Sequence, residues 1–404
     1  MRRFKYQAKD RKTGRIVNGT VQADSEQIAG KILVDQGYTP SRITEETESF
    51  FSRFQNRVST KERIAFTRQF ATLIGAGMPL SASLQMIVDQ TENKATKALV
   101  EDILAQVESG KSLYLAFKKH PEVFNNVYLS LVEAGEASGT LDVSLRRLAD
   151  QQEKDADMIS KIRGAMTYPA IVLFVIVAVV IFLMLQVVPQ VENLYNDLRE
   201  PLPALTAVMV AISNFIANFW WLVLVILGIA VWFFIQFKRT EAGTKTVDKF
   251  KLHAPLVNGL FMRLYNARFA RTMQMLLSAG VPMLEAIKIS GNAINNTLLE
   301  KEVHEAEEMV RSGKPLSVSL KGRENVLPLI PQMAATGEQS GKIDEMLGRA
   351  ATVYETELDE RLAAIQTLIE PVLMVVLAVV AGGIVGAILF PIYSLVSKIG
   401  AGGI

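Results

Sequence analysis

The sequence has 404 residues, of which 50% are hydrophobic, and its mean hydropathy is positive. That balance favours a few membrane helices joined to sizeable aqueous lobes. The formal net charge is only +2, so no global excess of charge predicts nucleic-acid binding. The absence of cysteine excludes thiol catalysis, disulfides and cysteine-ligated metals.

The first residues predict two short strands. Phe4, Tyr6 and Ala8 alternate with polar residues, and the same alternation runs through residues 17–23. Such alternation is typical of half-buried strands, here joined around Gly14.

A helix and then a polar tether follow these strands. Asp24 with Gln27 suits a helix N-terminus, and Gly37 suits its end. We therefore expect a small α+β domain over residues 1–43 and a linker over residues 44–60. Basic residues open the chain without the apolar stretch of a cleaved signal peptide, so we expect the N-terminus to be cytoplasmic.

Three segments are apolar enough to cross a bilayer, which takes roughly 20 helical residues. They are residues 168–188, 219–237 and 371–396. Buried helices of soluble proteins rarely run this long without a charge. Residues 205–218 are also apolar, and two interpretations stay open for them: an interfacial helix or an early start to the second span.

The placement of Lys and Arg predicts the orientation. Residues 1–20 hold seven Lys or Arg and one acid, and five Lys or Arg follow the second span within residues 238–251. The loop 189–204 holds one Arg and three acids. We therefore expect the N-terminus and residues 238–370 inside, and the loop outside.

An internal repeat is the most informative feature. The second copy lies 203 residues after the first, and 202 after one deletion. The aligned pairs are FTRQFATLIGAGMPL (66–80) with FARTMQMLLSAGVPM (269–283), ESGKSL (108–113) with RSGKPL (311–316), GEASGTLDVSL (135–145) with GEQSGKIDEML (337–347), and Tyr168-Pro169 with Glu370-Pro371. The unit is a soluble lobe followed by one membrane helix, used twice on the cytoplasmic side.

Each lobe has a helical pattern. Ser59 with Glu62 forms a capping-box sequence, Gly75 and Gly77 end the helix that follows, and Gly110 ends a later amphipathic helix. We expect two repeated cytoplasmic helical-bundle lobes in a mostly α integral membrane protein with three transmembrane helices. The expected domains are the N-terminal α+β domain (1–43), a linker (44–60), lobe 1 (61–167), transmembrane helix 1 (168–188), an external loop (189–204), an amphipathic segment with transmembrane helix 2 (205–237), lobe 2 (238–370), transmembrane helix 3 (371–396) and a short external tail (397–404).

Candidate chemistry in the lobes is weak. Gly110-Lys111-Ser112 resembles part of a P-loop, but the first glycine position holds Ala105 and the preceding residues are helical in pattern. The histidines, His120, His253 and His304, lack the spacing of zinc ligands. No cofactor is expected.

Glu136 and Glu338 recur in the two copies, together with Asp142 and Asp344. Paired acids can hold a divalent cation or act as acid and base, and helix capping is the alternative that we favour. The nearby glycines are expected to set tight turns between helices. The recurring residues expected to be structural are Gly77, Pro79, Gly135, Glu136, Gly139, Pro169, Gly280, Pro282, Gly337, Glu338, Gly341 and Pro371.

Together these motifs resemble the GspF/PilC family over nearly the whole chain. The resemblance rests on the F-x-Y-x-A start at Phe4, the two L/I-x-x-G-x-P turns, the two GE-x-SG segments and the Glu-Pro pair before the third span. These are platform proteins of type II secretion systems and type IV pilus machines.

The resemblance implies an inner-membrane homo-oligomer without catalytic activity. The lobes, around residues 61–167 and 249–369, would engage a hexameric assembly ATPase. The spans would face lipid and the transmembrane helices of pilins or pseudopilins, beside other inner-membrane assembly proteins; no nucleic acid is implied. Pilus, secretion and competence machines share the motifs, so the choice among them stays open. Two alternative functions are considered. One is a subunit of an oligomeric transporter or channel, which is disfavoured because the spans lack interior ionisable residues. The other is a membrane enzyme that uses Glu136 and Glu338.

The cysteine-free sequence allows a direct test of topology. Single cysteines at Ser109, Asn193 and Ser312 should react differently with a membrane-impermeant thiol reagent in intact cells: we expect labelling at position 193 alone. Labelling of all three after permeabilisation is the control, and labelling at position 312 in intact cells would place the second lobe outside.

Overall fold

The computed structural model describes residues 2–10, 16–23, 30, 34, 38–45, 58–197, 201–255 and 257–401. The chain divides into two compact units, Met1–Phe66 with Leu84–Ala105, and Thr67–Ser83 with Gln106–Ile404. The fold class predicted from the sequence is confirmed, because the chain is mostly helical and contains three long apolar helices.

The N-terminal strands form a three-stranded antiparallel sheet. Strands β1 (Arg2–Asp10) and β2 (Ile16–Ala23) pair as the alternating pattern predicts. The third strand, β3 (Tyr38–Glu45), was not predicted; it pairs with the other side of β1. Pro40 lies on this edge strand, where a missing backbone donor is tolerated. The helix predicted over residues 24–37 and most of the linker lie outside the described residues.

Lobe 1 contains five helices and the start of a sixth. Ser59 and Glu62 form the predicted capping box: the Ser59 amide donates to Glu62 Oε2 at 2.9 Å, and the Glu62 amide donates to Ser59 Oγ at 3.2 Å. The helices are α3 (Thr60–Gly75), α4 (Leu80–Gln90), α5 (Lys94–Glu108), α6 (Leu113–Lys118), α7 (Asn126–Ser138) and α8 (Leu141–Asp197).

Lobe 2 repeats this order at the same offset, with one helix before it. Its helices are α10 (Glu241–His253), α11 (Asn258–Ser278), α12 (Met283–Ala293), α13 (Thr297–Arg311), α14 (Leu316–Leu320), α15 (Leu329–Ser340) and α16 (Ile343–Ala401). Helices α11 to α16 therefore correspond to α3 to α8.

The two lobes fill equivalent core positions with different side chains. In lobe 1 the buried rings of Phe117 and Tyr128 lie 5.3 Å apart in an edge-to-face arrangement, a geometry that aromatic pairs favour. The equivalent positions in lobe 2 hold Leu320 and Ile330, both fully buried. The repeat thus preserves which positions are buried while changing their volume.

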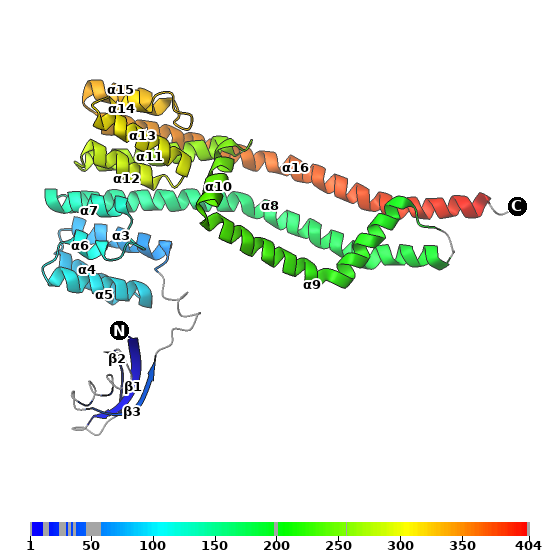
Figure 1. The fold of residues 1–404 in the computed structure, drawn as a ribbon, viewed down its shortest axis with the longest axis horizontal. Helices are drawn as coiled ribbons and strands as arrows, with labels where there is room; N and C mark the ends of the chain where they lie inside the picture. The colour runs from blue at the N-terminus through cyan, green and yellow to red at the C-terminus, as the bar shows by residue number, and fades with distance from the viewer. Residues whose placement is uncertain are drawn as a thin grey trace. The chain divides into compact units, whose positions relative to one another are not determined.

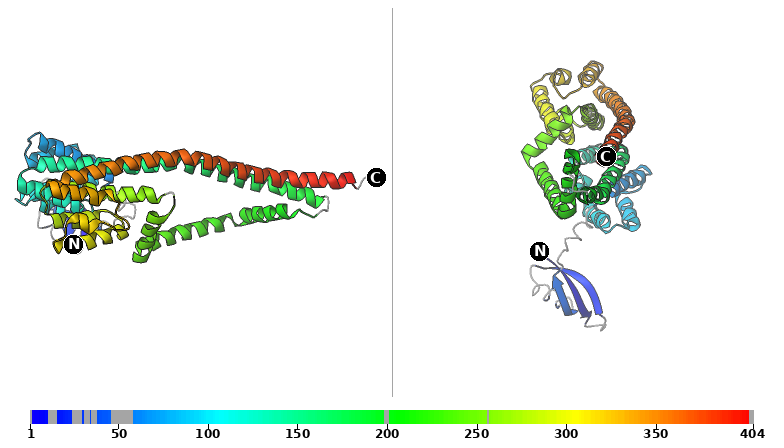
Figure 2. Two further views of the ribbon diagram at one scale, coloured as in Figure 1. Left: turned by 90° about the horizontal axis from the view of Figure 1, so that it is seen from above. Right: turned by 90° about the vertical axis from the view of Figure 1, so that its right-hand side faces the viewer.

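Each membrane segment lies inside a much longer helix (Figure 1). Helix α8 has 57 residues and α16 has 59, and each runs without interruption from its lobe through the apolar segment. The loop was expected to start at residue 189, but the structure shows helix there: α8 continues through Pro189 to Asp197. Figure 2 shows α8 and α16 side by side in a second view.

Residues 205–218, for which an interfacial helix or an early start to the second span was expected, lie in the second membrane helix, α9 (Ala204–Arg239). They are helical, and a kink at Phe219, whose dihedrals are non-helical, joins them to the rest of α9. Ser213 Oγ donates to the carbonyl oxygen of Met184, inside the first apolar segment, at 2.5 Å. Residues 204–218 therefore lie beside the first span, as an early start to the second.

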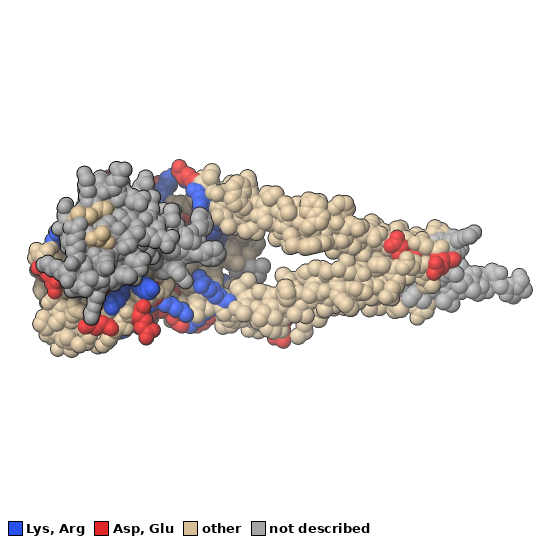
Figure 3. Space-filling model, turned by 90° about the horizontal axis from the view of Figure 1, so that it is seen from below, with Lys and Arg blue, Asp and Glu red and all other residues tan. Residues whose placement is uncertain are grey.

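Charged side chains are unevenly spread along the long helices (Figure 3). Lys and Arg gather next to the lobes, uncharged surface covers most of the helices, and acids reappear towards the far end. In the apolar 18-residue stretch of each of the three helices, at most 11% of the residues are buried within the chain. Most of these side chains therefore face outward. Three such helices make the chain a multi-pass membrane protein.

The motif glycines perform two different tasks. Gly139 and Gly341 have φ of +71° and end α7 and α15 in the left-handed conformation, as predicted. Gly135 and Gly337 were expected to set turns, and that expectation is wrong: both lie inside helices. A Cβ on Gly337 would lie 2.6 Å from Ile343 Cα, so glycine permits the close approach of α15 to the start of α16.

Gly337→Ala should therefore destabilise lobe 2 by about 1–3 kcal/mol, the usual cost of overpacking. Thermal unfolding of the full chain in detergent should show a lower midpoint. Gly164→Ala is the matched control, because a Cβ on this helical glycine meets no neighbour; an unchanged midpoint for Gly337→Ala would contradict the close approach.

Candidate functional site

The recurring glutamates hold the N-termini of two short helices. Glu136 Oε1 accepts a hydrogen bond from the Leu113 amide at 2.8 Å, and Oε2 accepts one from the Tyr114 amide at 3.1 Å. In lobe 2, Glu338 accepts from the Ser317 amide at 3.3 Å and from Ser317 Oγ at 2.5 Å. A carboxylate is favourable at the positive end of a helix. Each glutamate thereby fastens α6 to α7, or α14 to α15.

A metal or acid–base role for these glutamates gains no support from this geometry. Both carboxylate oxygens of Glu136 already accept backbone hydrogen bonds. Asp142 and Asp344 lie in the first turns of α8 and α16. No group of three His, Asp or Glu able to hold a metal occurs among the described residues. The structural role assigned to these residues stays a prediction.

The other recurring motif residues lie at helix ends or within the membrane helices. Gly77 and Gly280 adopt φ of +80° and +84° just after α3 and α11, each followed two residues later by a proline. Gly110 and Gly313 have φ of +85° and +92° after α5 and α13. The Ser112 side chain accepts from the Leu115 amide at the start of α6. The Gly-Lys-Ser sequence is thus a helix end followed by a helix cap.

An arginine–glutamate pair joins α3 in lobe 1, and its counterpart α11 in lobe 2, to the helix that enters the membrane. Arg68 of α3 donates to Glu153 of α8 through Nε at 2.6 Å and Nη2 at 2.5 Å. Arg271 of α11 donates to Glu355 of α16 through Nε at 2.9 Å and Nη2 at 2.7 Å. Both are two-pronged pairs, which fix direction as well as distance. The hydrogen bonds from Arg68 lower the pKa of Glu153.

These two pairs occupy equivalent positions in the repeat, and we call them the lobe clamps. The motif alignment contained their signal, because Arg68 and Arg271 match within the first aligned segment. Sequence reasoning missed it because the partners, Glu153 and Glu355, lie between two aligned segments, in stretches that were not aligned. They become neighbours of the arginines only when the chain folds back.

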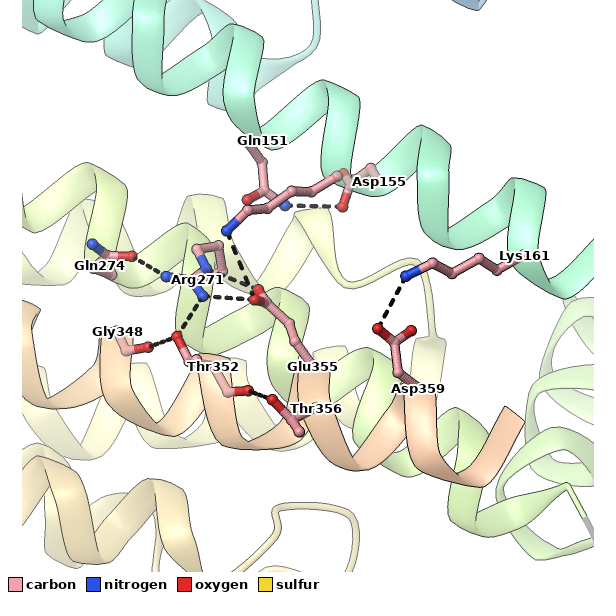
Figure 4. Close-up of polar contacts among 11 residues, drawn as sticks. Gln151, Asp155, Lys161, Arg271, Gln274, Gly348, Thr352, Glu355, Thr356 and Asp359 are labelled. Atoms are coloured by element: carbon pink, nitrogen blue, oxygen red, sulfur yellow. Dashed lines mark hydrogen bonds and ion pairs between the residues drawn. The ribbon is translucent and has the colours of Figure 1, made fainter. Parts of the chain in front are cut away.

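A second set of contacts joins α8 directly to α16 (Figure 4). Lys161 Nζ lies 3.0 Å from Asp359 Oδ2, and the two side chains point toward one another from the two helices. Lys154 Nζ lies 4.0 Å from Glu355, the acid of the second lobe clamp. The pKa of Lys161 is raised by its hydrogen bonds to Asp359 and Asp157.

An apolar cluster fills the space between these charges. Leu358 is fully buried and packs with Leu362 of α16 and Leu260 of α11. Met158 and Ile162 of α8 pack against the same cluster. Aliphatic contact removes apolar surface from water, whereas the exposed ion pairs add little energy and chiefly fix the register. We call this α8–α11–α16 contact the joint; it brings both lobes together just before their membrane segments.

Comparison with known proteins identifies the family. The family described as "Type II secretion system (T2SS), protein F" matches residues 66–189 and again residues 269–391, which are the two lobes with their membrane helices. The chain belongs to the type II secretion system protein F family. Residues 1–44 match the N-terminal domain of the same family. The resemblance stated from the motifs is confirmed.

Relatives in this family carry two kinds of names. A type IV pilus assembly protein PilC of Thermus thermophilus is 34% identical over 403 residues, covering 98% of each chain. A type IV pilus assembly protein TapC of Aeromonas hydrophila is 33% identical, covering 98% of this chain and 96% of the relative. A type II secretion system protein F of Aeromonas hydrophila is 34% identical, covering 93% and 98%.

Removing a recurring glutamate should free the short helix that it holds. Glu136→Ala leaves the Leu113 and Tyr114 amides without their acceptor, at a cost of about 1.5–3 kcal/mol for hydrogen bonds to a charged group. Hydrogen exchange of these two amides should accelerate in the variant. Glu101→Ala, an exposed position on α5, is the control; unchanged exchange in Glu136→Ala would contradict the capping role.

Proposed function

We propose that this family member is an inner-membrane platform protein of a type IV pilus or type II secretion machine. Its lobes receive motion from a cytoplasmic assembly ATPase, and its membrane helices pass that motion to the transmembrane helices of pilin-like subunits. The observation that carries the proposal is the continuity of α8 and α16, each of which begins inside a lobe and ends beyond an apolar segment.

A continuous helix is suited to transmitting a displacement. At 1.5 Å per residue, α8 is about 85 Å long, which exceeds the hydrocarbon core of a bilayer, roughly 30 Å. The lobe clamps fix α3 to α8 and α11 to α16, and the joint fixes the two long helices to each other. Rotation or displacement of one lobe would therefore move both membrane helices together.

The outward faces of the spans offer apolar side chains to lipid or to other helices. Phe174 and Phe182 of α8 expose 73% and 61% of their surfaces, and Val379 of α16 exposes 69%. Pilin-like membrane helices are apolar partners of the kind that such faces suit, because packing in lipid depends on shape and close contact.

The proposed orientation places the N-terminus and both lobes in the cytoplasm. The gathering of Lys and Arg beside the lobes supports this orientation. A hexameric ATPase would then reach lobes 1 and 2 from the same side. A subunit of a transporter or channel is not favoured, since the relatives are named for assembly and secretion.

Breaking one lobe clamp should uncouple the machine without removing the protein. Glu355→Gln takes the charged partner from Arg271, whose side chain is only 12% exposed, at a cost of about 1–3 kcal/mol. In cells that build the filament or secrete through it, we expect output to fall while the amount of membrane-inserted chain stays the same. Output is measured as sheared filaments or secreted substrate.

Glu345→Gln is the matched control, because this acid pairs with Arg349 on the same helix and with Lys342 just before it. The purified chain should hydrolyse no ATP but should retain the assembly ATPase in mild detergent. Normal output from cells lacking the chain, or ATP hydrolysis by the chain alone, would contradict the proposed function.

A further inference from the structure

Lobe 1 has a groove between α6 and α7 that lobe 2 occupies. The space between the lobes has a volume of about 480 Å³ and is lined by Tyr114, Lys118 and Ser130 of lobe 1 and by Lys288, Asn292 and Arg311 of lobe 2. The lobe 2 residues lie on α12 and α13. Ile289, which also lines this space, is only 7% exposed.

Lobe 2 has the same groove, and it is not occupied by any other part of the described chain. Ser317, Lys321 and Gln332 stand at the positions of Tyr114, Lys118 and Ser130. They line a space of about 440 Å³ between α14 and α15, and every residue around that space belongs to lobe 2. Val318 lies in its wall and exposes 52% of its surface.

Lobe 1 has the complementary face, which no described part of the chain covers. Helix α4 corresponds to α12, so Gln85, Met86 and Asp89 stand at the positions of Lys288, Ile289 and Asn292. All three are exposed. Met86 exposes 37% of its surface, whereas Ile289 exposes 7%. Within the part of the chain that the structure describes, the repeat thus leaves one unpaired groove on lobe 2 and one unpaired face on lobe 1.

We propose that the α14–α15 groove of one copy of this chain binds the α4 face of a second copy, repeating between molecules the contact that already joins α12 to the α6–α7 groove. The charges fit this occupant. The groove carries Lys321, whereas Arg323 in its wall is already paired with Glu305 of the same lobe. The face carries Asp89, with Glu108 at the position of Arg311. Opposite charges across a contact select the partner and its register.

The geometry of the repeat keeps such copies in one membrane. Helices α8 and α16 leave their lobes in the same direction and run side by side. The rotation and translation that superpose lobe 1 on lobe 2 therefore keep the direction of the membrane helices. If the same movement relates two copies of the chain, their membrane helices also point the same way. A contact between two different surfaces, repeated head to tail, produces a ring if it closes and an open row if it does not. This inference does not depend on the proposed function.

Cross-linking of the cysteine-free chain tests the contact. Asp89→Cys in one tagged copy and Gln332→Cys in a second, differently tagged copy are co-expressed at full length and treated in membranes with a short bis-maleimide. We expect a covalent dimer carrying both tags. Ser130→Cys with Asn292→Cys in a single chain is the matched control, because these residues line the occupied groove; it should cross-link within one molecule.

Charge reversal sharpens the test. Lys321→Glu in the Gln332→Cys copy should lower the yield of the dimer about tenfold, since like charges then face each other, while Lys321→Arg should leave it unchanged. Absence of the mixed dimer when the control pair reacts would overturn the proposal. Two other outcomes would also overturn the proposal. Dimers formed by the Asp89→Cys chain alone would mean that the α4 face binds a second α4 face, and cross-linking of Gln332→Cys only to a different protein would mean that another partner fills the groove.

Discussion

The arrangement of this protein depends on the way in which each lobe is fixed to the helix that enters the membrane. A helix passes on a displacement only if its base is held at more than one point along its length. The pairs Arg68–Glu153 and Arg271–Glu355 provide one such point in each lobe, and the packing of Leu358 against neighbouring helices provides another. Packing of α7 on α8 and of α15 on α16 adds to these fixed points, so that each lobe is held to its long helix along several turns.

The repeat has diverged where the two copies meet different surroundings. Met86 and Ile289 occupy equivalent positions, yet Met86 is exposed, whereas Ile289 is buried and lines the space between the two lobes. Core positions differ in another way. Lobe 1 has Phe117 and Tyr128 where lobe 2 has Leu320 and Ile330, and all four side chains are buried. Core positions tolerate changes of hydrophobic side chain when neighbours adjust, whereas surface positions change with what covers them. Positions that are buried in both copies therefore serve core packing, whereas positions that are buried in only one copy lie where that copy contacts another surface.

Much of the fold could be predicted from the sequence, because its signals are local. The capping box at Ser59, the left-handed glycines at 139 and 341, and the apolar segments each depend on a few neighbouring residues. Strand β3 was missed because it contains Pro40, a residue that is rare inside strands, although an edge strand accommodates proline. The helical positions of Gly135 and Gly337 were missed because a close approach involves residues that follow after a turn. The lobe clamps and the joint required the fold itself, since their partners are far apart in sequence.

The prolines inside α8 have a mechanical consequence. Pro169 and Pro189 bracket the first apolar segment, and each lacks the amide that would bond the carbonyl four residues earlier. The carbonyls of Ala165 and Leu185 are thus left to find other donors, and water at the two membrane surfaces is the nearest source. Bending should concentrate at these two depths, so that the segment between them behaves as a stiff rod with a pivot at either end. Pro371 and Pro391 lie within α16 at the same spacing, which gives the two long helices matched pivots.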